Sequence, residues 1–396
     1  MARVQSDIAE RLLALLLLVV VALVAGLTLG HATGRLEELP GLLLMVPAAI
    51  ALRGNIFGAL GSRLGTAIHA GTFRLSLRPN TPVGENVIAS VVLTIATSVV
   101  LALLAKGAAI VFGIADSISI EAFVVVSLVG GLVASAAVLL TALALTAGSV
   151  RFGWDPDNIT APLVTAVGDV ATVPALVLAS QLVDQRAVAL PTTIIGLVAM
   201  PLAVLAVFTF GRSGLGTIVR ESLPVLVVGI VLDLIAGVTV ERQLDRFTLF
   251  PALLVLLPAF LAVAGALGGT MSSRLASQLH LGLIGPNRIP EARARSEIAT
   301  SLALAVPTFA VCGLLAHGFA VGSNLASPGI GLLLAASLLG GLVATALAAG
   351  VAYYSTIGSL RAGFDPDTYG IPLVTSTLDL LGAFTLILAL ELLGIA

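Results

Sequence analysis

Eleven stretches of mainly apolar residues divide the sequence, and polar residues are concentrated between them. A helix needs about twenty apolar residues to cross the hydrocarbon core of a bilayer. The pattern therefore predicts eleven transmembrane helices, near residues 8–30, 41–70, 86–112, 120–148, 158–183, 188–210, 217–239, 250–281, 297–319, 328–358 and 367–395. The connecting segments are too short for a folded soluble domain, so we expect an all-α integral membrane protein.

Composition excludes a soluble globular protein. Hydrophobic residues make up 58% of the 396 residues and charged residues 10%, whereas about a quarter of a soluble domain is charged. The net charge of −2 provides no basic surface for nucleic acid. The single cysteine, Cys312, excludes a disulfide framework and a cysteine-based metal cluster.

Arginine is distributed unequally between the two sides of the predicted bundle. If the N-terminus is inside, the inner segments hold eleven arginines and the outer loops hold four. Cytoplasmic segments are enriched in basic residues. We therefore expect a multi-pass protein of the cell membrane with a cytoplasmic N-terminus and an external C-terminus.

The sequence repeats itself at an offset of about 211 residues. PAAIALRGNIFGALGSRLGTAIHAG, from Pro47, matches PAFLAVAGALGGTMSSRLASQLHLG, from Pro258. FGWDPDNITAPLVTAVGD, which ends at Asp169, matches AGFDPDTYGIPLVTSTLD, which ends at Asp379. These matches predict a first repeat over residues 8–183, a linker with one extra helix over 184–216, and a second repeat over 217–396.

The extra helix determines how the repeats are oriented. Each repeat holds five spans, an odd number, so direct fusion would invert the second copy. The helix near 188–210 has no counterpart and restores the parity. We therefore expect parallel repeats related by a pseudo-two-fold axis along the membrane normal, with an ion pathway on that axis.

Asp169 and Asp379 are the strongest candidates for a metal site. Each lies about a dozen residues into the last span of its repeat, close to the bilayer midplane. A carboxylate at that depth costs about 2.5–3.5 kcal/mol on insertion scales. A hard divalent cation such as Mg²⁺ would offset both charges, and Thr165 and Thr375, one turn earlier, could add hydroxyl ligands or hold waters. The alternative is a protonated, hydrogen-bonded structural pair.

Other residues are weaker candidates. Gly54, Asn55 and Gly265 could line a pathway where backbone carbonyls become available, although small residues also allow close helix packing; Pro162 and Pro372 could kink the aspartate-bearing helices. Asp155, Asp157, Asp365 and Asp367 resemble helix caps, or could form an acidic mouth. Glu85 and Glu297 open the third helix of each repeat, and Asp233 is a buried acid without a counterpart.

The combination of Pro47, Gly54 and Asn55 with SRL and the later DPDN motif ending at Asp169 resembles the membrane domain of MgtE magnesium channels. It is more similar to the solute carrier 41 family, which carries two such domains in tandem. The resemblance implies a Mg²⁺ permease in which Asp169 and Asp379 line the ion path. It also implies that Gly54, Asn55 and, in part, Gly265 lie against the pore; Ala266 replaces the asparagine in the second repeat.

These observations favour transport of a divalent cation, with Mg²⁺ as the transported and bound ion and no organic cofactor. The expected partners are the cation and the lipid bilayer, and a monomer is consistent with repeats that mimic a dimer. An exchanger coupled to Na⁺ or H⁺ is the main alternative to a channel, with Asp233 holding the coupling ion. A lipid-modifying enzyme is less well supported, because HExxH and nucleophile-elbow motifs are absent and no catalytic residue is identified.

Overall fold

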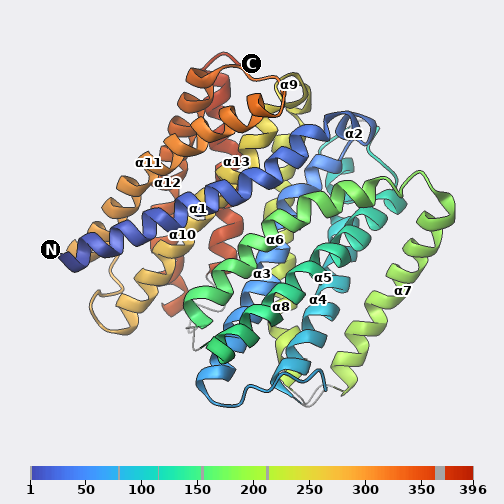
Figure 1. Ribbon diagram of the computed structural model, residues 1–396, viewed down its shortest axis with the longest axis horizontal. Helices are drawn as coiled ribbons and strands as arrows, with labels where there is room; N and C mark the ends of the chain where they lie inside the picture. The colour runs from blue at the N-terminus through green and yellow to red at the C-terminus, as the bar shows by residue number, and fades with distance from the viewer. Residues whose placement is uncertain are drawn as a thin grey trace. The chain divides into compact units, whose positions relative to one another are not determined.

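The computed structural model describes residues 2–78, 81–114, 116–152, 156–210, 214–361 and 371–395. All regular structure within these ranges is α-helical. In chain order the helices shown in Figure 1 are α1 (Ala2–His31), α2 (Thr33–Glu38), α3 (Leu42–His69), α4 (Pro82–Val111), α5 (Ile120–Phe152), α6 (Pro156–Ser180), α7 (Arg186–Phe210), α8 (Gly214–Glu241), α9 (Leu244–Leu249), α10 (Ala252–His280), α11 (Ala292–Gly322), α12 (Ile330–Arg361) and α13 (Ile371–Leu392).

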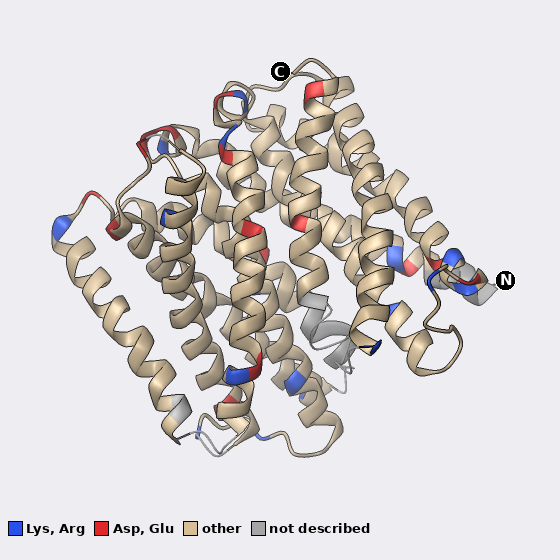
Figure 2. Cartoon of the chain, turned by 180° about the vertical axis from the view of Figure 1, so that it is seen from behind, with Lys and Arg blue, Asp and Glu red and all other residues tan. Residues whose placement is uncertain are grey.

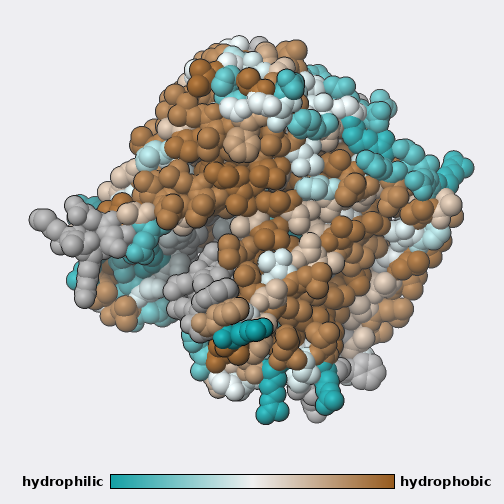
Figure 3. Space-filling view, viewed as in Figure 1, coloured by the Kyte–Doolittle hydropathy of each residue, from teal (hydrophilic) through white to brown (hydrophobic). Residues whose placement is uncertain are grey.

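Eleven of the described helices are long and apolar enough to cross a membrane, and they coincide with the eleven predicted spans. Charged residues are few and lie mostly near helix ends (Figure 2). On the face shown in Figure 3, the surface of the long helices is largely hydrophobic. A large apolar surface is unfavourable in water but favourable in contact with the hydrocarbon chains of lipids. The prediction of an all-α integral membrane protein is confirmed.

Local sequence explains where several helices begin and end. The Thr81 hydroxyl accepts a 3.2 Å hydrogen bond from the Gly84 backbone N–H, and Pro82 occupies the first position of α4. Both features favour a helix start. After α3 and α10 the chain turns at Gly71 and Gly282, whose φ values are 66° and 67°. Glycine adopts this left-handed conformation without steric cost, so it ends both helices in the same way.

The chain divides into two compact units. The central unit contains residues Arg35–Leu234, and the terminal unit contains Met1–Gly34 together with Ile235–Ala396. In the central unit α6 packs against α3 and α5, and α4 packs against both α3 and α5. In the terminal unit α10 contacts α1, α11, α12 and α13.

The first helix of each sequence repeat packs with helices of the other repeat. In the terminal unit α1 lies so close to α10 that a Cβ atom at Gly26 would overlap the Val255 carbonyl. In the central unit Arg63 of α3 donates a 3.2 Å hydrogen bond to Ser222 of α8. The compact units therefore differ from the contiguous repeats by an exchange of one helix.

Two further helices, α2 and α9, have no predicted counterpart because six residues carry too little hydrophobic signal. The two short helices are separated in sequence by the same offset as the two repeats, so they occupy equivalent positions. The predicted extra helix is α7, which packs on α4 and α5 and exposes large apolar side chains such as Ile195 and Leu202. This surface is suited to lipid.

Candidate functional site

Asp169 is a buried carboxylate on α6, within the apolar span Leu163–Ser180. Its side chain is 7% exposed. No described residue forms a hydrogen bond or an ion pair with it. A buried charge is costly unless it is paired or hydrogen-bonded, and the described residues supply none of the partners that a structural aspartate requires.

The same surface of α6 packs on the glycine-rich segment of α3. A Cβ atom at Gly58 would lie 3.2 Å from the Thr165 hydroxyl oxygen, and one at Gly54 would lie 3.5 Å from the Thr165 methyl carbon. The absence of side chains at both glycines therefore brings Thr165 against the backbone of α3. Two groups of residues predicted separately, the threonine and the glycines, meet in the central unit.

The terminal unit contains an equivalent arrangement of α10 and α13. A Cβ atom at Gly265 would lie 3.8 Å from Oδ1 of Asp379, and one at Gly269 would lie 3.5 Å from the Thr375 methyl carbon. Asp379 and Thr375 are half-buried and both make further polar interactions. In each unit, a helix that carries an aspartate and a threonine one turn apart lies against a glycine-rich helix.

The remaining pathway candidates are less well placed. Asn55 is half-buried on α3 beside Gly54. Pro162 and Pro372 belong to α6 and α13, and Asp157 is the second residue of α6, but the side chains of all three are outside the described part. Asp155, Asp365 and Asp367 lie outside the described residues.

Two of the weaker acidic candidates occupy different environments. Asp233 is 1% exposed on α8 in the central unit. Glu85 lies in the first turn of α4, as predicted, and its carboxylate closely approaches Gly214 at the start of α8.

The expectation that Glu297 opens a helix is wrong, because α11 begins five residues earlier, at Ala292. Its carboxylate instead lies between two guanidinium groups, 3.2 Å from Nη1 of Arg11 and 3.4 Å from Nε of Arg274. Gln278 also donates to it at 3.4 Å. Glu297 therefore links α1, α10 and α11 in the terminal unit.

Arg53 on α3 was missed by the sequence reasoning. It is 1% exposed, and its Nη2 atom donates a 3.2 Å hydrogen bond to the Ser98 hydroxyl. Within the described structure, Nε and Nη1 have no hydrogen-bond acceptor. An arginine in the middle of the apolar stretch 41–70 is a visible signal, but it has no equivalent in the second repeat, where Ala264 occupies the position.

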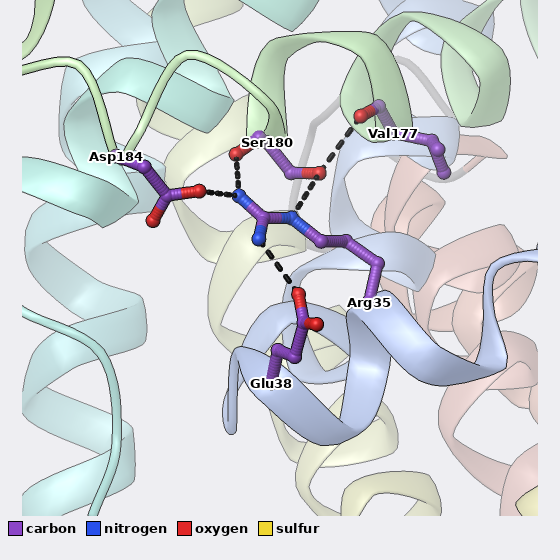
Figure 4. A network of polar contacts seen from close by, with 5 residues as sticks. All are labelled: Arg35, Glu38, Val177, Ser180 and Asp184. Carbon is purple, nitrogen blue, oxygen red and sulfur yellow. Dashed lines mark hydrogen bonds and ion pairs between the residues drawn. The ribbon is translucent and has the colours of Figure 1, made fainter.

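The end of α6 is held by a polar network around Arg35 (Figure 4). The guanidinium donates to the Ser180 carbonyl at 2.5 Å, to Asp184 at 2.7 Å and to Glu38 at 2.8 Å. Partial burial alone would lower the pKa of Arg35, but the bonds to Glu38 and Asp184 outweigh it, so this pKa is raised above its usual value. The network fixes the helix that carries Asp169.

The ligand set available in each unit consists of a carboxylate, a hydroxyl and backbone oxygens. Among the described residues, no three His, Cys, Asp or Glu side chains form a metal-binding group. Oxygen ligands suit hard cations, and Mg²⁺ commonly keeps several waters and binds only one or two carboxylates. The chemistry of the site is compatible with a partly hydrated ion.

Comparisons with known proteins identify the relatives of the chain. A sequence model of the MgtE family, described as divalent cation transporter, matches residues 46–179 and 257–389. The second match begins 211 residues after the first, which is the offset of the internal repeat.

Similar proteins belong to solute carrier family 41. Member 3 from Rattus norvegicus is 24% identical over 374 residues, with 89% of this chain and 79% of that protein covered. Member 2 from Xenopus laevis is 23% identical over 393 residues, with 91% and 66% covered. Member 2 from Homo sapiens is 22% identical over 383 residues, with 88% and 64% covered. No solved structure matches the chain significantly.

Proposed function

Because the chain belongs to the MgtE family of divalent cation transporters, we propose that it carries Mg²⁺ across the membrane and that Asp169 and Asp379 bind the partly hydrated ion. Membership of a transporter family means that the chain is not an enzyme. The observation that supports the proposed site is a carboxylate on an apolar helix, packed against a glycine-rich helix, in each of the two units.

Mg²⁺ is the expected ion because of the ligand chemistry. Its small radius and high charge favour carboxylate and hydroxyl oxygens over nitrogen or sulfur. Asp169 supplies a carboxylate that no described residue engages, and Thr165 supplies a hydroxyl one turn away. The glycines of α3 and α10 leave the adjacent backbone uncovered by side chains, so Gly54, Asn55 and Gly265 remain the proposed lining of the path.

The arrangement of the path follows from the internal repeat. We propose that the repeats are parallel and that equivalent helices contribute to one pathway on their pseudo-two-fold axis. We also propose a location in the cell membrane with a cytoplasmic N-terminus, since arginines favour that orientation. A single chain would then provide both carboxylates and could act as a monomer.

A coupled exchanger is the second candidate. Asp233 is fully buried on α8 and has no acidic counterpart in the first repeat, where Ala22 occupies the equivalent position. A buried ionisable residue in a transmembrane helix commonly belongs to an ion or proton pathway. In this alternative Asp233 holds Na⁺ or H⁺ while the other two aspartates hold Mg²⁺.

The test is Mg²⁺ uptake into liposomes that contain the purified protein. We expect Asp169→Asn and Asp379→Asn each to lower the initial uptake rate at least about tenfold, because an amide removes the charge that offsets the ion. Asp245→Asn is the matched control, since it removes an exposed carboxylate from α9. Undiminished uptake by a folded double variant would disprove the proposed site. Dependence of uptake on a Na⁺ or pH gradient would favour the exchanger over the channel.

A further inference from the structure

Arg53 is a fully buried charge in the middle of a membrane-spanning helix. Its side chain is 1% exposed, and one hydrogen bond, to Ser98, is its only interaction within the described residues. No carboxylate in this part of the chain lies within ion-pair distance of it. Burying a guanidinium with so few partners is unfavourable, so the charge requires an explanation beyond packing.

The space around the guanidinium is filled by protein. A Cβ atom at Gly131 of α5 would lie 2.6 Å from Nη2 of Arg53 and 2.5 Å from the Ser98 hydroxyl oxygen. Glycine at this position therefore makes room for the arginine side chain. The guanidinium is therefore enclosed by α4 and α5 on this side.

In the second repeat, the residues equivalent to Arg53 and its neighbours include no charged side chain. Ala264 stands at the position of Arg53, Phe309 at that of Ser98 and Gly341 at that of Gly131. The Phe309 ring covers Gly341 closely and also contacts Phe260, with ring centroids 5.0 Å apart. Apolar side chains therefore fill the equivalent contact between helices in the second repeat, and packing alone does not require the arginine.

Arg53 lies next to the residue that precedes Asp169. A Cβ atom at Gly168 would lie 3.5 Å from Cβ of Arg53 and 3.7 Å from the backbone nitrogen of Gly54. Adjacent Cα atoms are 3.8 Å apart, so the backbone of Asp169 is within about 10 Å of the Arg53 Cβ atom. The guanidinium lies at the other end of the side chain, against Ser98 and Gly131, so its charge reaches Asp169 across the low-dielectric interior, where it is screened less than in water.

We propose that Arg53 sets the affinity of the first-repeat carboxylate for divalent cations. The proposal rests on the proposed function of Asp169. The positive charge offsets the negative charge of Asp169 when no ion is bound, and it repels a divalent cation that binds there. In the second repeat, Ala264 replaces the arginine at the position equivalent to Arg53, so this particular charge is absent there. The two carboxylates therefore differ in their affinity for the ion. The ion is held less tightly at Asp169, and it can leave from there.

The test compares variants that remove the charge with one that keeps it. The double variant R53A/S98F reproduces the second repeat's alanine and phenylalanine, and Arg53→Met is a second, unbranched replacement. We expect both to tighten Mg²⁺ binding to the purified protein, measured by titration calorimetry, at least about tenfold. We expect Arg53→Lys, which keeps the charge, to bind within about threefold of the unmodified protein.

The same variants in an Asp169→Asn background identify the carboxylate on which Arg53 acts. We expect the tightening to disappear there and to persist in an Asp379→Asn background. A tightening that survives Asp169→Asn would mean that Arg53 acts on another group, such as Asp233, and would overturn the proposal. Unchanged or weaker binding in the charge-free variants would overturn it too, as would a failure of both to fold while Arg53→Lys folds.

The outcome also separates this proposal from the function on which it rests. If Asp169→Asn alone binds Mg²⁺ as the unmodified protein does, or if the unmodified protein binds none, the proposed function is wrong. If Asp169→Asn weakens binding and removal of the Arg53 charge changes nothing, the proposed function stands and only the role of Arg53 is wrong.

Discussion

A glycine on the fourth predicted span of each repeat makes room for a large side chain from a neighbouring helix. Gly131 on α5 faces the Arg53 guanidinium, whereas Gly341 on α12 faces the Phe309 ring. The glycine is retained although the side chain that it accommodates changes from a charged to an aromatic one. Close approach, more than the chemistry of the neighbour, therefore explains the glycine at both positions.

Gly341→Ala should destabilise the protein by about 1–3 kcal/mol, because overpacking a tight contact forces side chains or backbone to move. The added methyl group would overlap the Phe309 ring, which is buried and cannot swing away. Thermal unfolding of the purified protein in detergent measures the effect. Gly350→Ala on the same helix is the control, since no atom lies within 4 Å of a Cβ there. Equal unfolding temperatures for the two variants would contradict this account.

At the scale of residues, the sequence predicts what the two repeats share and misses what they do not. Asp169, Thr165 and the glycines of α3 could be selected because each has a counterpart about 211 residues later. Arg53 has none, so comparison of the repeats hides it. Contact between Thr165 and Gly58 also required the structure, because spacing along one helix does not specify which neighbouring helix it meets.

The short helices α2 and α9 are connected to the ends of the aspartate-bearing helices. Arg35 on α2 bonds to Ser180 and Asp184 at the end of α6. Arg246 on α9, at the equivalent position, lies 3.9 Å from Glu391 at the end of α13. The first connection is short and multiple, whereas the second is single and long. The end of α6 should therefore be held more firmly than the end of α13.

Arg35→Ala should lower the free energy of unfolding by about 1–2 kcal/mol, because it removes several charge-assisted hydrogen bonds at a partly buried position. Arg246→Ala should change it by less than about 0.5 kcal/mol, as is usual for an exposed ion pair. Thermal unfolding of both variants in one detergent makes the comparison. An equal loss in the two variants would show that the network around Arg35 contributes no more than a surface pair.

At the scale of elements, hydropathy was sufficient to locate the eleven long helices, because each needs about twenty apolar residues. It could not reveal α2 and α9, which have six residues each. It also placed Glu297 at a helix start, because the amphipathic turn from Ala292 to Glu297 is too polar to be recognised as part of a span. Helix ends that extend beyond the apolar core carry no hydropathy signal.

The whole chain combines its two repeats by exchanging their first helices. Sequence identity indicates the two repeats, but it could not indicate the packing partners of α1 and α8, since every span is similarly apolar. Specific close contacts decide the pairing instead. Gly26 on α1 meets the backbone of α10 at Val255, and Glu297 of α11 pairs with Arg11 of α1. Each compact unit is therefore complete only with a helix from the other repeat.

A chain cut between α7 and α8 should yield two fragments that purify together when they are co-expressed. The first fragment contains α1, which packs on α10 and α11 of the second fragment. The second fragment contains α8, whose residues up to Leu234 belong to the central unit, where Ser222 bonds to Arg63. Gly26→Ile in the first fragment should reduce recovery of the pair several-fold, because a side chain there would overlap the Val255 carbonyl. Gly34→Ile, where no atom lies within 4 Å of a Cβ, should not. Fragments that fold separately and do not associate would refute the exchange, since contiguous repeats would then be self-sufficient.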